Sequence, residues 1–174
     1  MARHKRVAGP TRGETGAGGC ETAARHPRRL ASRPVQVISD LSRVPWSGER
    51  AVITIGAFDG VHLGHAAVVA QVRELADALA ARSVVVTFDR HPATVVRPES
   101  APRLLTDLPT KLELLAATGL DATVVLTFDA ARSHESAHQF VQEVLVEGLA
   151  TRAVVIGEDF HFGHHREGNV KLLE

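Results

Sequence analysis

This sequence is short of cysteine, of long hydrophobic runs and of net charge. Its single cysteine, Cys20, can form neither a disulfide nor a cysteine-based metal site within one chain. No apolar run approaches the roughly 18 residues of a transmembrane helix, so we expect a cytoplasmic protein without a membrane partner. Since 44% of the 174 residues are apolar, the remaining expectation is a globular domain with a hydrophobic core.

The formal net charge is zero, but the charges are unevenly distributed. Residues 1–33 carry eight Lys or Arg residues against Glu14 and Glu21, whereas residues 34–174 carry eighteen acidic residues against twelve basic ones. The second part is therefore mildly acidic and predicts no nucleic-acid partner. Residues 1–33 lack periodic apolar positions, so we expect a disordered basic extension followed by one domain over residues 34–174. The oligomeric state stays open.

Strand and helix patterns alternate through residues 34–174. Apolar, β-branched runs predict strands at 51–55, 84–88, 122–128 and 153–156, with a short edge strand at 35–38. Apolar periodicity and cap residues predict helices at 64–82, at 110–118, from 136 to about 149 and from about 169, with an irregular loop at 94–109. This alternation predicts an α/β fold with a parallel sheet and helices on both faces.

Three polar or glycine-rich clusters follow the predicted strands, at 56–65, 88–92 and 157–168. Ligands of parallel sheets bind at the carboxyl ends of the strands, so we expect these clusters to share one site. The first cluster also opens a helix, whose free N–H groups and dipole favour an anion. His62 and His65 lie there and could donate hydrogen bonds to phosphate oxygens. We therefore predict that this segment binds a nucleotide.

Other interpretations of these residues stay open. The two histidines could be a metal pair or plain surface residues, but no spacing assigns a third ligand, so no protein metal site is predicted. The absence of a Walker A pattern and of G-x-G-x-x-G after the first core strand disfavours a P-loop NTPase and a dinucleotide dehydrogenase. Phe88 and Phe160 could pack in the core rather than line a ligand site. Phe162 stands among glycine and histidines and is less typical of a core position.

Residues 55–65 read IGAFDGVHLGH and contain the His-x-Gly-His element of nucleotidylyltransferases. More narrowly, they resemble the adenylyltransferase module of bacterial bifunctional riboflavin kinase/FAD synthetases. Further elements of that family are similar in order: T-F-D-P-H-P at 87–92, L-T-x-x-x-x-K-x-x-L-L at 105–115, F-V-x-x-V-L-V-x-x-L at 140–149, and V-G-x-D-F-x-F-G-x-x-R-x-G at 155–168. The resemblance spans residues 34–174 and implies a Rossmann-like sheet of the HxGH type.

The resemblance also implies an activity, namely transfer of AMP from ATP to FMN to give FAD and pyrophosphate, with Mg²⁺ accompanying ATP. It implies that His62 and His65 are catalytic and contact the ATP phosphates. The nucleotide pocket would be shaped by Gly56, Phe58, Asp59 and Gly64, together with the two histidines. The flavin would lie against Phe88, His91, Pro92, Asp159, Phe160, Phe162 and Arg166. No covalent enzyme intermediate is required, because the FMN phosphate attacks directly.

Some positions depart from the family's pattern. Ala57 stands in place of Asn, Arg90 in place of Pro, and His161 in place of Arg or Thr. The family's S-S-T-x-x-R element and its riboflavin kinase domain are not found in these residues, so we expect the adenylyltransferase domain to be incomplete at its C-terminal end. Two alternatives stay open: a weakly active or inactive flavin- or nucleotide-binding fragment, and a nucleotidylyltransferase with another phosphorylated acceptor.

Overall fold

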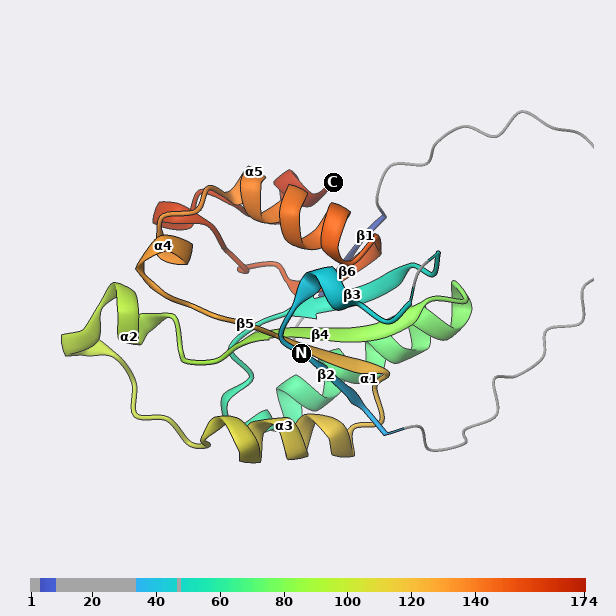
Figure 1. Cartoon of the computed structure of the whole chain (residues 1–174), viewed down its shortest axis with the longest axis horizontal. Coiled ribbons are helices and arrows are strands. Elements are labelled where there is room, and N and C mark those ends of the chain that lie inside the picture. Colours follow the sequence, from blue (N-terminus) through green and yellow to red (C-terminus); the bar gives the residue numbers. More distant parts are fainter. Residues whose placement is uncertain (1–3, 9–33, 47) are drawn as a thin grey trace, which may run out of the picture.

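A six-stranded sheet forms the centre of the computed structural model, which describes residues 4–8, 34–46 and 48–174 (Figure 1). The strands are β1 (His4–Ala8), β2 (Gln36–Ile38), β3 (Ala51–Ile55), β4 (Arg82–Phe88), β5 (Ala122–Leu126) and β6 (Thr151–Gly157). Their order across the sheet is β1-β6-β3-β4-β5-β2. Strands β2 to β6 pair in parallel, which confirms the predicted α/β class.

Strand β1 corrects the expectation for part of residues 1–33. His4–Ala8 pairs antiparallel with β6, with His4 opposite Gly157 and Ala8 opposite Ala153. The physical reason is that β6 has β3 on one side only, so its other edge offers unpaired backbone groups to a further strand. The other residues of the predicted extension lie outside the described part of the chain, and their disorder stays a prediction.

Helices cover both faces of the sheet (Figure 1). Their bounds are α1 (Leu63–Ala78), α2 (Ala93–Val96), α3 (Leu108–Ala117), α4 (Ala130–Ser133) and α5 (Ala137–Phe140), and α5 continues as a π-helical segment, Val141–Gly148. On one face α1 buries Val72 and Ala76 against Val52 of β3. On the other face Phe140 and Val144 belong to the cluster that holds Ile53. None of the helices in the described residues is long and apolar enough to cross a membrane.

The element boundaries differ from expectation where caps and turns decide them. Helix α1 ends at Ala78, before Arg82, because Ala80 has a left-handed φ of 49° and the Ala81 N–H donates back to the Ala76 carbonyl at 2.9 Å. Helix α3 begins within the predicted loop, because the Asp107 side chain accepts a hydrogen bond from the Thr110 N–H and caps it. That loop also contains α2, and the helix expected near residue 169 is a 3-10 turn, Val170–Leu173. Because β3, β4 and β5 are neighbouring parallel strands, their carboxyl ends lie side by side at one edge of the sheet.

Candidate active site

The turn after β3 is the first part of the site. All five residues of β3 are buried, and the chain leaves the strand at Gly56 and enters a 3-10 turn, Asp59–Val61, before α1. Phe58 is 3% exposed and has a φ of 51°, and Val61 has a φ of 38°. Left-handed backbone at non-glycine residues costs about 1–3 kcal/mol each and persists only where the surroundings impose it. The turn is thus held by contacts from elsewhere in the chain.

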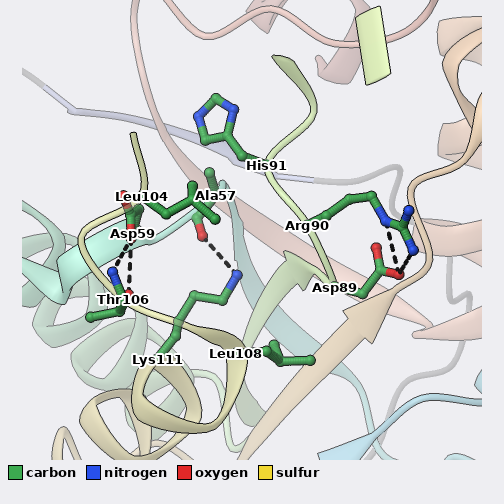
Figure 2. A pocket seen from close by; sticks show the side chains of 9 residues that line it. All are labelled: Ala57, Asp59, Asp89, Arg90, His91, Leu104, Thr106, Leu108 and Lys111. Atoms are coloured by element: carbon green, nitrogen blue, oxygen red, sulfur yellow. Dashed lines mark hydrogen bonds and ion pairs between the residues drawn. The ribbon is translucent and has the colours of Figure 1, made fainter. Parts of the chain in front are cut away.

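The Asp59 carboxylate makes several of the contacts that fix the conformation of this turn (Figure 2). Its carboxylate accepts hydrogen bonds from the Leu105 N–H at 2.8 Å, from the Thr106 N–H at 2.9 Å and from the Thr106 hydroxyl at 2.9 Å. The Thr106 hydroxyl oxygen in turn accepts a bond from the Gly60 N–H at 3.1 Å. Burial opposes ionisation, but these hydrogen bonds outweigh it and hold the pKa of Asp59 below its ordinary value.

Asp59→Asn is expected to destabilise the fold at neutral pH and to lose that effect in acid. An amide cannot accept all three bonds, so we expect an unfolding free energy lower by about 1 kcal/mol at neutral pH. The folded-state pKa of Asp59 lies below 3.8, so its carboxylate stabilises the fold above pH 3.8 and loses this contribution as the pH falls further. Thermal unfolding of both proteins should therefore show a Tm difference that shrinks below pH 3.8.

Asp77→Asn is the matched control for this titration, because Asp77 is exposed on α1 and distant in sequence from the turn. This variant should keep a Tm close to that of the wild type at neutral pH. A difference for Asp59→Asn that stayed constant or widened below pH 3.8 would contradict the assignment.

The two histidines form a stacked pair at the start of α1. Their ring centroids lie 3.7 Å apart with an interplanar angle of 18°. The His62 Nδ1 accepts a hydrogen bond from the His65 backbone N–H at 3.4 Å, which caps the helix and leaves the proton of the neutral ring on Nε2. A Cβ at Gly64 would lie 3.2 Å from the His62 ring, so glycine lets the imidazole lie across the first turn.

His65 is half-buried between this ring and Phe58, whose ring centroid lies 4.8 Å away. Burial, followed by the neighbouring His62, lowers the pKa of His65, while Asp59 acts in the opposite direction. Its buried Nδ1 has no hydrogen-bond partner among the described residues. The pair therefore presents one outward Nε2–H on His62 and a neutral imidazole behind it, beside the positive end of a helix dipole.

A small pocket adjoins this turn (Figure 2). It is lined from three segments by Ala57, Asp59, Asp89, Arg90, His91, Leu104, Thr106, Leu108 and Lys111. Asp59, predicted to shape the nucleotide pocket, and His91, predicted to contact flavin, thus meet at one hollow. Asp89 anchors the second of these segments, since its carboxylate accepts bonds from the Phe128 N–H at 2.9 Å and from the Arg90 guanidinium at 3.2 Å.

Lys111 lines the same pocket and was not predicted as a site residue. It is 7% exposed, and its Nζ donates hydrogen bonds to the Phe88 carbonyl at 2.8 Å and the Ala57 carbonyl at 3.2 Å. Burial lowers the pKa of Lys111, whereas Asp59 and Asp89 act to raise it. One sequence signal could have identified it: Lys111 lies one helical turn before the buried Leu115, on a face that is normally apolar.

The predicted aromatic flavin contacts also serve the core. Phe160 and Phe162 stack with centroids 5.7 Å apart, and Phe162 lies 5.7 Å from Phe140. Both are partly buried against the main hydrophobic cluster, so Phe162 is closer to a core position than expected. Phe88 packs edge-on against Phe128 at 5.3 Å and contacts the same cluster. Within the described residues, the pocket of Figure 2 is not lined by Pro92, Asp159, Phe160, Phe162 or Arg166.

The late loop, residues 158–168, is seated on the start of α5. The His164 N–H donates to the Glu135 carbonyl at 2.8 Å, and the Glu167 carboxylate accepts from the Ala137 N–H at 2.7 Å. Glu135 is itself buried and paired with Arg132 at 2.8 Å. A more open, polar hollow lies beside this region, lined by Thr127, Asp129, Ala131, Arg132, His134, Glu135, Gln139 and Glu143. Of the predicted site residues, all of which lie in the described part of the chain, only Asp59 and His91 line the pocket of Figure 2, and none lines this second hollow.

The FAD synthetase family model matches residues 44–174. The chain belongs to the FAD synthetase family. A bifunctional riboflavin kinase/FMN adenylyltransferase of Pseudomonas fluorescens is 36% identical over 140 residues, which cover 80% of this chain and 45% of that protein. The protein of the same name from Escherichia coli K12 is 35% identical over 140 residues, 80% of this chain and 44% of the relative. The chain spans about half the length of these curated relatives.

A solved structure shares the fold of this FAD synthetase domain. It is described as a macrolide-efflux protein from Streptococcus pneumoniae, with a TM-score of 0.66 and 18% sequence identity over 80% of this chain and 54% of that chain. The family resemblance inferred from residues 55–65 and the later elements is therefore confirmed, as is the parallel α/β fold. No comparison tests the individual residues, so the roles of His62, His65 and the flavin contacts stay predictions.

The FAD synthetase domain does not present a complete metal cage in its described part. No three His, Cys, Asp or Glu side chains among those residues lie close enough together to hold a metal ion. The carboxylates that line the pocket, Asp59 and Asp89, already accept hydrogen bonds from neighbouring backbone N–H groups. These residues therefore do not fit a site in which the protein supplies most of the ligands to Mg²⁺.

Proposed function

We propose that this chain transfers AMP from ATP to FMN, giving FAD and pyrophosphate. In this reaction a phosphate oxygen of FMN bonds to the α-phosphorus of ATP, the bond from that phosphorus to the bridging oxygen breaks, and pyrophosphate leaves. One observation carries the proposal. In a chain of the FAD synthetase family, the turn that leads to His62 and His65 and the loop after β4 meet at one pocket.

The geometry supports a phosphate-binding role for the histidine pair. The Nε2–H of His62 faces outward, because its Nδ1 accepts the helix-capping bond. The first turn of α1 adds backbone N–H groups without intrahelical partners and the positive end of the helix dipole. Donors held in place before the reaction stabilise the negative charge that develops on the transferring phosphate. In this account both imidazoles contact the phosphates, and the stacking of their rings, with centroids 3.7 Å apart, keeps them in position.

Mg²⁺ belongs to this proposal as a companion of ATP. It would be held mainly by the phosphates and water, because the described protein residues supply no cluster of three ligands. Its chemical contribution would be to neutralise phosphate charge. The flavin contacts at residues 88–92 and 159–166, a cytoplasmic location and the absence of a nucleic-acid partner also stay predictions.

The test is to incubate the chain with labelled ATP, FMN and Mg²⁺ and to follow the label into the products. Label at the α-phosphate should appear in FAD, and label at the γ-phosphate should appear in pyrophosphate. FMN binding without FAD formation would indicate the binding-fragment alternative, and adenylylation of a different phosphorylated compound would indicate another acceptor. Riboflavin offered in place of FMN should give no FMN, and its phosphorylation would contradict the predicted activity of these residues.

A further inference from the structure

The sheet ladder between β3 and β4 ends at the point where the two loops of the site begin. The two strands pair in parallel, with Ile55 in register with Val86. Just beyond this pair, the Gly56 N–H donates a hydrogen bond to the Val86 carbonyl at 3.0 Å. Two residues beyond the Ile55–Val86 pair come Ala57 and Phe88, whose carbonyls both accept hydrogen bonds from the Lys111 ammonium. Lys111 of α3 thus bridges the strands where their own pairing stops.

Burying an ammonium is costly, which makes a role in packing alone a poor explanation. A side chain nine-tenths buried is normally apolar, and a methionine of similar length would need no hydrogen-bond partners. The cost of burying the Lys111 ammonium is offset by hydrogen bonds to two carbonyls. It is also offset by two carboxylates, Asp59 and Asp89, that line the same pocket. One carboxylate comes from each of the two loops that the ammonium joins.

We infer that Lys111 is a positioning residue: its ammonium holds the nucleotide turn (residues 56–62) and the flavin loop (residues 88–92) at a fixed separation. This inference rests on the proposed function, which places one substrate on each segment. In-line attack requires the FMN phosphate and the α-phosphorus to meet in one orientation, and a displacement of about 1 Å can cost about 100-fold in rate. Each substrate can still bind its own segment when the separation changes.

The direct test is Lys111→Met, which keeps the length and removes the donors. We expect kcat for FAD formation to fall at least about tenfold, while the KM values for ATP and FMN change less than about threefold. The matched control is Arg73→Met. Arg73 ties α1 to the end of α3 by donating to the Thr118 carbonyl at 2.8 Å, away from the pocket. Its loss should lower Tm without lowering kcat.

Hydrogen exchange supplies a second measurement that does not need activity. Backbone amides in residues 56–62 and 88–92 should exchange faster in Lys111→Met than in the wild type, and they should not in Arg73→Met. If Lys111→Met fails to fold, Lys111→Gln replaces it, because its amide is uncharged and its shorter side chain cannot donate to both the Ala57 and the Phe88 carbonyls. That variant should also speed exchange in both segments.

The outcomes separate the inference from the proposed function. A wild-type chain that makes no FAD would contradict the proposed function, and the exchange comparison would still decide whether Lys111 holds the two segments. If Lys111→Met matches Arg73→Met in kcat and in exchange, the positioning role is overturned. Recovery of most of the lost kcat by Lys111→Arg, which keeps the donors, would support it.

Discussion

His62→Ala should lower kcat for FAD formation by about 100- to 1,000-fold while changing the KM for FMN less than about threefold. The reason is that the outward Nε2–H is placed to meet charge on the transferring phosphate, whereas the flavin ring is expected on other segments. Steady-state kinetics with each substrate varied in turn would measure this. Equal losses in turnover and in flavin affinity would instead indicate a structural role for His62.

A second variant separates the chemical role of His62 from its capping role. His62→Asn keeps a side-chain acceptor for the His65 N–H but lacks the Nε2–H. It should retain the stability of the wild type and still lose kcat as His62→Ala does. His138→Ala is the control, because His138 is exposed on α5, outside the turn and the first turn of α1 that form the proposed phosphate site. A His62→Asn variant with wild-type turnover would contradict the phosphate-binding role.

Gly163→Ala should have the largest effect on stability. Gly163 has a φ of 74°, and an added Cβ would lie 2.6 Å from the Ala137 backbone N, a contact that the start of α5 cannot relieve without moving. Left-handed strain and overpacking together predict an unfolding free energy lower by about 2–4 kcal/mol. Urea unfolding would measure it. Since the late loop carries predicted flavin contacts, the KM for FMN should also rise.

Gly48→Ala measures the effect of left-handed backbone strain without the steric clash that Gly163→Ala adds. Gly48 has a φ of 83°, but nothing lies within 4 Å of an added Cβ there, so this variant pays for the backbone conformation alone. We expect it to lose about 1 kcal/mol and to keep the wild-type KM for FMN. Similar losses of stability in the two variants would show that the seating of the late loop on α5 is not tight.

The core strands were predictable because the composition of each segment alone indicates that it is buried. Residues 51–55 form a continuous run of apolar and β-branched residues except for Thr54, and the structure buries all five. Ser136 and Gln139 likewise predicted a helix start, and the Ser136 hydroxyl does accept a bond from the Gln139 N–H. Strand β1 was not predictable in this way, because HKRVA becomes a strand by pairing with β6, far along the chain.

The site was predictable only as separate pieces. The helix start at His62 and the glycine turn before it are local features, so the sequence could indicate an anion site there. The contacts that hold the turn come from residues about 46 positions away, as the bonds from Leu105 and Thr106 to Asp59 show. Such contacts leave no periodic pattern, and a lysine within a helix normally predicts an exposed position, so the burial of Lys111 was missed.

A crystal structure of the chain with FMN and an ATP analogue that carries a methylene group between the α- and β-phosphorus tests the account most directly. We predict the α-phosphate against the imidazoles of His62 and His65, with the flavin ring along residues 88–92 at the same edge of the sheet. A nucleotide bound away from both imidazoles, or a flavin at the opposite edge of the sheet, would contradict the account.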